Sequence, residues 1–135
     1  MVSVNNRTKS SINLGLVKKI AAAFLKKYRK TGFDLSIAFV GDKTIRNLNN
    51  RYLKKDSVTD VLAFPGDEGF FGEIIINYAQ VKRQSKHYSK SVKDELVFVL
   101  VHGLYHLYGY GDRSKEEKDR MDKLSKKFIK ELDFI

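Results

Sequence analysis

Apolar residues return every three or four positions in two long stretches of the chain, and this spacing predicts amphipathic helices. The first stretch covers residues 13–30, with apolar positions from Leu16 to Tyr28 and lysines on the opposite side. Gly32 follows it and predicts a C-terminal glycine cap. The second stretch covers residues 114–132 and predicts a final helix with one inward-facing apolar side.

Between them, every position from Leu96 to Val101 is apolar, which fits either a buried strand or a buried helix. We favour a helix because Ser91 and Asp94 form a start that resembles a capping box. The apolar character also continues past Leu107, which is too far for an ordinary strand. Since it is apolar on all sides, this helix is expected to be central and buried.

Four shorter segments are rich in strand-forming residues and predict a sheet. They are residues 2–5, 35–40, 58–64 and 70–76. The last two are separated by a turn that contains Pro65, the only proline, and a short helix is expected from Asp42 towards Tyr52. Strands mixed with helices, without strict alternation, predict one α+β domain over residues 1–135, with about four strands in a mixed sheet packed on helices.

The amino-acid composition indicates the cellular compartment in which this domain is expected to work. The chain has no cysteine, which excludes disulfides, thiolate zinc sites and cysteine nucleophiles, and fits a reducing compartment. The longest uncharged run, residues 96–111, contains two histidines and three glycines and is too short and polar to span a bilayer. The first residues lack an apolar signal core, so we expect a cytoplasmic protein without membrane contact.

Positive charge is concentrated in two segments. Lys and Arg number 26 against 16 Asp and Glu, a net charge of +10, and residues 1–32 and 78–93 contain bases but no acid. Such a distribution attracts polyanions, of which nucleic acid is the usual one. The alternative is that these lysines are ordinary solvated helix faces.

The spacing H-x-x-x-H-x-x-G-x-x-D indicates a metal site. His102 and His106 are one turn apart on the predicted helix, so both imidazoles can reach a single ion. Gly109 can reverse the chain and return Asp112 as a third ligand. Zinc is the expected ion, one per chain, with another divalent metal as the alternative. Hydrogen-bonded core histidines are the alternative to a metal site, and His87, among lysines, is expected at the surface.

This spacing parallels the metzincin protease motif with one departure. Gly103 follows the first histidine where those proteases carry their general-base glutamate. Two imidazoles and one carboxylate leave a coordination position open for water, as in catalytic zinc sites. We assign no catalytic group beyond that metal-bound water.

Two groups of basic residues are candidates for RNA contact. Arg51, Lys54 and Lys55 lie in the polar segment 48–65, where they could reach phosphates if the segment lines a cleft. Solvated loop lysines are the alternative for this group. The second group consists of Lys82, Arg83 and Lys86. Exposed tyrosines could stack bases, and the candidates are Tyr52, Tyr105 and Tyr108.

Four segments together resemble the YbeY family of bacterial metal-dependent endoribonucleases. The family shows L-N-x-x-Y-R-x-x-D-x-x-T-[DN]-V-L-[SA]-F-P, then G-[DE]-I, then H-G-x-L-H-L-x-G-Y-D-H, then an acidic helix with a methionine. Here these are residues 48–65, residues 72–74, residues 102–112, and Glu116 and Glu117 with Met121. Their order and spacing make the resemblance specific, and it covers nearly the whole chain.

The resemblance implies a zinc-dependent endoribonuclease of single-stranded RNA. It also implies maturation of the 3′ end of 16S ribosomal RNA, ribosome quality control, and the ribosome or its small subunit as partner. His102 and His106 match the family's first two ligands, whereas its third histidine falls on Asp112. The family's functional arginine falls on Leu53.

Other functions remain open on the sequence alone. The main alternative is a non-catalytic RNA-binding ribosome-assembly factor with a structural metal, favoured by the altered third ligand and by Leu53. A metallopeptidase is a further alternative, against which Gly103 counts. A site of two histidines and one carboxylate would also suit an iron oxygenase, but the basic surface and the resemblance favour RNA.

Overall fold

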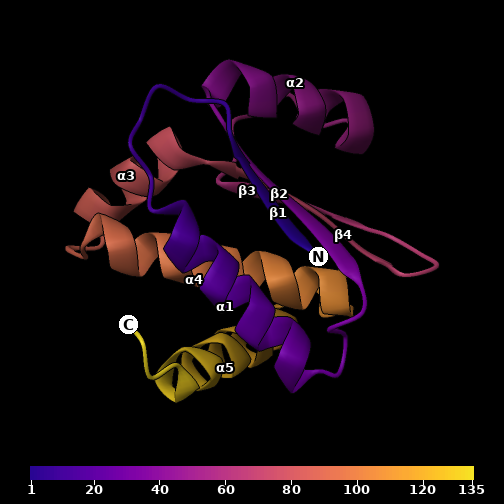
Figure 1. Ribbon diagram of the computed structural model, residues 1–135. Helices are drawn as coiled ribbons and strands as arrows, with labels where there is room; N and C mark the ends of the chain where they lie inside the picture. Colours follow the sequence, from indigo (N-terminus) through magenta and orange to yellow (C-terminus); the bar gives the residue numbers. More distant parts are fainter.

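The strands of the domain form one mixed sheet. A computed structural model describes residues 1–135, with strands β1 (Val2–Asn6), β2 (Asp34–Val40), β3 (Val61–Pro65) and β4 (Phe70–Asn77). Their order is β1-β2-β4-β3 (Figure 1). β2 pairs parallel with β1 and with β4, and β3 pairs antiparallel with β4. The α+β class and the four-stranded mixed sheet predicted from the sequence are confirmed.

Five helices cover the two faces of this sheet. They are α1 (Leu14–Lys27), α2 (Asp42–Leu53), α3 (Tyr78–His87), α4 (Val92–Tyr108) and α5 (Lys115–Glu131). Figure 1 shows α2 alone on one face, with α1 and α4 on the other and α5 packed beyond α4. None of these helices combines the length and the apolar character that a bilayer-crossing segment needs.

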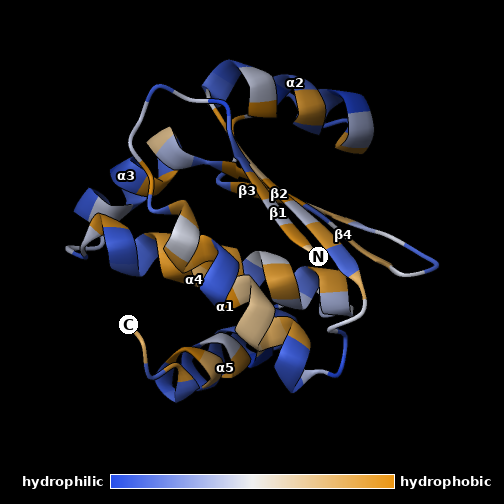
Figure 2. Cartoon of the chain, viewed as in Figure 1, coloured by the Kyte–Doolittle hydropathy of each residue, from blue (hydrophilic) through white to orange (hydrophobic).

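Alternation along the strands divides the apolar residues between two cores. Leu35, Ile37 and Phe39 of β2 face the larger core, which contains α1, α4 and α5. Ala38 and Val40 face the smaller core under α2. Figure 2 shows α4 as the most continuously apolar helix, and most of its residues are buried, as the sequence predicted for a central helix.

One expectation about the helices was wrong, and one helix was missed. α1 ends at Lys27, and the left-handed reversal falls on Arg29, with φ of 57°, instead of on Gly32. The amide of Lys30 then donates to the carbonyl oxygen of Leu25 at 2.7 Å, which closes the last turn early. Helix α3 was not predicted, because Val81 is the only apolar residue that it buries.

A β-bulge interrupts the pairing of β2 with β4. Asp34 pairs with Phe70 and Leu35 with Gly72, so Phe71 is the extra residue on β4. Gly72 has φ of +148°, and a Cβ there would lie 2.6 Å from the carbonyl oxygen of Phe64. The bulge therefore requires glycine at this position.

Candidate metal centre

Helix α4 holds both candidate histidines close to its C-terminal end. The hydroxyl of Ser91 caps its start by accepting from the amide of Asp94 at 3.0 Å, as expected. Gly109 ends it in the left-handed conformation, with φ of +117°. This reversal turns the chain back so that Oδ2 of Asp112 lies 3.5 Å from Nε2 of His106. The predicted role of the glycine is confirmed.

The hydrogen bonds of His106 leave one ring nitrogen available to a cation. Its Nδ1 lies 3.2 Å from the carbonyl oxygen of Tyr110. A carbonyl oxygen only accepts, so Nδ1 carries the proton and donates it. In the neutral imidazole, Nε2 then keeps its lone pair on the side of Asp112, which is the arrangement that histidine ligands of metals show.

His102 has partners that the sequence reasoning missed, both on α5. Its Nε2 lies 2.9 Å from Oδ1 of Asp122, and its Nδ1 lies 3.1 Å from Oγ of Ser125. Because the Ser125 hydroxyl can donate or accept, it tolerates either tautomer of the imidazole. One sequence signal could have found this contact, since Ser125 occupies an inward position between Met121 and Phe128 on an otherwise apolar helix face.

The three predicted ligands and Asp122 line one cavity of about 910 Å³, here called the histidine cavity. Within it, His102 pairs with Asp122 and His106 with Asp112. No three side chains of His, Asp or Glu converge closely enough in the structure to hold an ion. The sequence prediction therefore holds for the shared location, whereas joint coordination stays a prediction.

The donor set of the histidine cavity fits a divalent metal. Two ligands of one zinc ion lie about 3.3 Å apart, and the two imidazole–carboxylate pairs lie at 2.9 and 3.5 Å. Five carboxylates line the cavity: Asp60, Asp94, Glu95, Asp112 and Asp122. Only three lysines do so: Lys90, Lys126 and Lys130. A bound cation would offset this excess of negative charge, and nitrogen and oxygen donors together suit zinc and other divalent ions.

Gly103 is a glycine because α4 packs closely on the sheet at this point. A Cβ there would lie 3.2 Å from Cγ2 of Ile74 and 3.3 Å from Cγ2 of Val61. The Cβ of a glutamate at this position would make these tight contacts, and its side chain would leave α4 on the side that faces the strands. The general base of zincin peptidases therefore has no place here.

The six basic residues that the sequence suggested for RNA contact do not line the histidine cavity. Arg51, Lys54 and Lys55 lie at the end of α2, which covers the opposite face of the sheet (Figure 1). Lys82, Arg83 and Lys86 lie on α3.

Arg83 is engaged in an ion pair. It binds both carboxylate oxygens of Asp42, at 2.6 and 3.2 Å, and this hydrogen bonding lowers the pKa of Asp42. Among the lysines of the histidine cavity, Lys90 pairs with Glu95 at 3.0 Å. Lys126 and Lys130 have no ion-pair partner, and the sequence reasoning did not select them.

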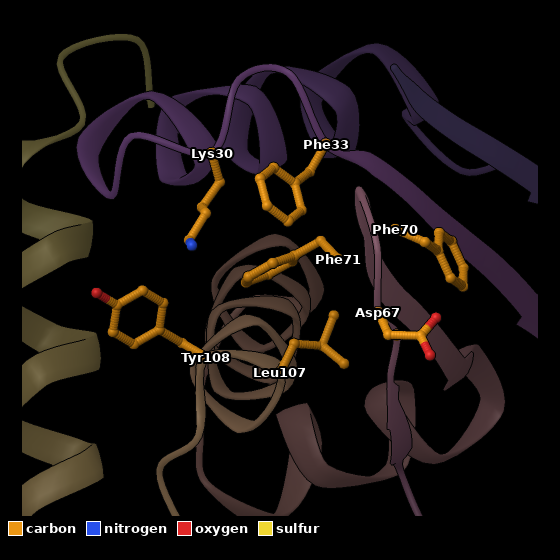
Figure 3. Close-up of a pocket in the computed structure, with 8 residues that line it drawn as sticks. Lys30, Phe33, Asp67, Phe70, Phe71, Leu107 and Tyr108 are labelled. Atoms are coloured by element: carbon orange, nitrogen blue, oxygen red, sulfur yellow. The ribbon is translucent and has the colours of Figure 1, made fainter.

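A second cavity, of about 430 Å³, lies on another side of the α4 terminus, and four of its eight lining residues are aromatic. Figure 3 shows Phe33, Phe70, Phe71 and Tyr108 around it, with the ammonium group of Lys30 directed towards Tyr108. We call it the aromatic cavity. Leu107 forms its floor, one residue from His106.

The three tyrosines that could stack on bases differ in their exposure to solvent. Tyr105 is buried, and its hydroxyl lies 2.8 Å from that of Tyr28; burial and this hydrogen bond raise the pKa of Tyr105. Tyr52 and Tyr108 are exposed, by 58% and 40%. Only these two can offer a ring face to a base.

The fold and site define a mixed α+β domain whose central helix presents two imidazoles to one cavity, each beside a carboxylate from the following loop or from α5. The model of the family described as endoribonuclease YbeY matches residues 3–133. The chain therefore belongs to the YbeY family.

Relatives support this assignment over most of the chain. The endoribonuclease YbeY of Finegoldia magna is 32% identical, over 98% of this chain and 94% of the relative. That of Thermodesulfovibrio yellowstonii is 43% identical, over 73% and 66%. The solution structure of TM1509 from Thermotoga maritima superimposes with a TM-score of 0.66 at 28% identity, covering 97% of this chain and 91% of that one.

Proposed function

We propose that this protein is a metal-dependent hydrolase that cleaves phosphodiester bonds within single-stranded RNA. The observation that carries the proposal is the pair of histidines on α4, each with its Nε2 beside a carboxylate in one cavity. Family membership supports the same activity, because the relatives are named endoribonucleases.

His102, His106 and Asp112 would hold the metal, and zinc suits this donor set. When bound, such an ion lowers the pKa of a water ligand or polarises a phosphoryl oxygen. The carbonyl of Tyr110 keeps the proton of His106 on Nδ1, so that Nε2 faces the cavity. Asp122 places a further carboxylate beside Nε2 of His102.

Two sets of basic side chains would hold the RNA. One set lines the histidine cavity, and the other lies further away, on α2 and α3. Lys126 and Lys130 line the histidine cavity without ion-pair partners, so they are free to bind phosphates there. The six residues suggested by the sequence would add weaker attraction from α2 and α3. Leu53 stands where the family has its functional arginine. Lys126 and Lys130 would therefore provide the positive charge that position 53 lacks.

The biological substrate we propose is ribosomal RNA. The resemblance to the family supports a role in maturation of the 16S RNA 3′ end and in ribosome quality control, in the cytoplasm. The net charge of +10 supports an RNA partner of this kind, with the ribosome or its small subunit as the assembly on which the protein acts.

The second candidate is a non-catalytic ribosome-assembly factor that binds RNA and uses any metal for structure. Two observations favour it: a carboxylate stands in place of the third histidine, and Leu53 in place of the arginine. A peptidase is disfavoured by the packing of Gly103 against β3 and β4.

Metal analysis combined with RNA cleavage tests the proposal. Wild-type protein, His106→Ala and the control His87→Ala, an exposed histidine at the end of α3, are purified without added metal. We expect equal metal in wild type and the control and loss of metal and cleavage in His106→Ala. Equal metal content in all three would refute the ligand assignment. Metal without cleavage of single-stranded RNA by wild type would favour the assembly factor.

A further inference from the structure

We infer that the aromatic cavity binds an unpaired base of the RNA substrate, next to the nucleotide that is cleaved. This inference rests on the proposed function and extends it to the substrate's recognition. It concerns a site separate from the histidine cavity, since the lining residues of the two do not overlap.

The walls of the aromatic cavity suit a flat ring. Figure 3 shows the rings of Phe33 and Phe71 in the middle of this lining, with Tyr108 on one side of them and Phe70 on the other. Tyr108 and Phe70 are each 40% exposed, so their rings are accessible from solvent. Base stacking on exposed aromatic rings is the common mode of single-strand binding and tolerates any base.

Two local irregularities bring these phenylalanines together. The bulge in β4 inserts Phe71 directly after Phe70, so that both reach the cavity instead of alternating across the sheet. Gly72 then allows Leu107 of α4 to approach the strand closely. The cavity is therefore built by backbone features of the fold and not by chance exposure of apolar side chains.

Charge around the aromatic cavity favours a nucleic acid over an apolar peptide. The ammonium group of Lys30 lies 4.8 Å from the centre of the Phe33 ring, at the rim. Two further exposed bases precede it in the chain: Lys26 in the last turn of α1, and Arg29 just beyond that helix. One carboxylate, that of Asp67, lies on the opposite rim. A nucleotide fits this arrangement with its base on the rings and its phosphate towards Lys30.

A line of aromatic groups connects the aromatic cavity to the candidate metal ligands. The rings of Tyr108 and Tyr110 lie nearly parallel, at 15° and 6.1 Å between centres. The carbonyl of Tyr110 accepts the hydrogen bond from His106, and the guanidinium of Arg120 lies 5.5 Å from the Tyr110 ring. A strand with one base in the aromatic cavity can thus continue along these rings towards the histidine cavity.

Fluorescence anisotropy with paired oligomers tests the inference. The probes are a nuclease-resistant phosphorothioate single strand of about 12 nucleotides, within the usual site sizes, and an abasic strand of the same length. Tyr108→Ala and Phe70→Ala should each weaken binding of the base-bearing strand about five- to a hundredfold and leave the abasic strand unaffected. Tyr108→Phe should retain wild-type affinity, because it keeps the ring. Lys30→Gln should weaken both strands alike.

Phe134→Ala is the matched control, an exposed phenylalanine near the C-terminus that lines neither cavity. Its affinity for both strands should equal that of wild type. The inference is overturned if wild type binds both strands equally, or if Tyr108→Ala and Phe134→Ala behave alike. If Tyr108→Ala fails to fold, Phe70→Leu replaces it, and an unchanged preference for bases counts against the site.

These binding measurements, taken together with the RNA cleavage assay described above, separate this inference from the proposed function. A protein that prefers the base-bearing strand through Tyr108 but never cleaves RNA would support the aromatic cavity and contradict the endoribonuclease activity. A protein that cleaves RNA and binds both strands equally would do the reverse.

Discussion

His102 and His106 differ in where their partners come from, although they are neighbours on α4. His106 is held by Tyr110 and Asp112, within six residues along the chain. His102 is held by Asp122 and Ser125 of the next helix, α5, which lie 20 and 23 residues further along the chain. The surroundings of His106 follow from the glycine cap that ends α4. The surroundings of His102 depend on how α4 and α5 pack together.

The first prediction concerns Asp122, whose carboxylate lies beside Nε2 of His102, the nitrogen that we propose binds the metal. Asp122→Asn should lower zinc affinity about 10- to 100-fold, because the charge next to the ligand is lost. Competition with a chromophoric chelator measures this affinity. Asp119→Asn, an exposed carboxylate on α5, serves as control and should bind zinc like wild type. Unchanged or tighter binding by Asp122→Asn would contradict the role of Asp122.

The second prediction concerns the ion pair between Asp42 and Arg83. Because the pKa of Asp42 is lowered from 3.8 in the folded protein, the pair stabilises the fold above that value and ceases to do so as the pH falls through the lowered pKa. Arg83→Gln should reduce the free energy of unfolding by less than about 1 kcal/mol at neutral pH, since the pair is partly exposed.

Urea unfolding of wild type and Arg83→Gln at pH 7 and at pH 2 measures this contribution. The difference between the two proteins should shrink at the acid pH. A difference that grows on acidification would show that the pKa shift has another source.

At the scale of elements, α4 was predictable because residues of the helix itself and of its two ends determine where it starts, where it stops and how deeply it is buried. Ser91 caps it, Gly109 ends it, and an apolar run fills it. The bulge in β4 was not predictable, since it depends on the register against β2 and not on the strand's own pattern. The sequence therefore located the helix that carries the site better than the strands that surround it.

The third prediction is that Gly72→Ala destabilises the fold by about 2 kcal/mol or more, through strain at positive φ and collision with the Phe64 carbonyl and Leu107. Gly32→Ala is the matched control, because a Cβ there meets nothing within 4 Å. Urea unfolding should show a lower midpoint for Gly72→Ala alone. Equal midpoints for both variants would mean that the bulge relaxes at little cost.

The same contrast between local and distant information applies to the candidate site. His102, His106, Gly109 and Asp112 lie within 11 residues, and their spacing alone placed them together. Lys126 and Lys130 reach the histidine cavity only because α5 packs on α4. A basic residue on a helix surface carries no sequence signal that tells which side of the folded molecule it will occupy.

At the scale of the whole molecule, a protein with a large positive net charge contains one cavity in which acidic side chains outnumber basic ones. The net charge is +10, yet the histidine cavity has five carboxylates against three lysines. Long-range attraction would therefore bring RNA to the surface, while close approach to the histidine cavity would require a bound cation.

The fourth prediction is that the double variant Lys126→Gln and Lys130→Gln weakens RNA binding and flattens its salt dependence. Loss of two phosphate contacts should reduce the slope of log affinity against log salt by about 1.4. The corresponding double variant at Lys54 and Lys55, across the sheet, should have a smaller effect. Equal effects would indicate that RNA is attracted by overall charge alone. Titrations at several salt concentrations measure both slopes.

The last turn of α4 contributes to both cavities, with His106 in one and Leu107 and Tyr108 in the other. An ion that fixes the position of His106 fixes the position of its two successors along the same rigid turn. Thermodynamic linkage then demands symmetry: whatever factor the ion adds to the affinity for a nucleotide, the nucleotide adds to the affinity for the ion. A nucleotide substrate would thereby help to retain the metal ion proposed for the histidine cavity.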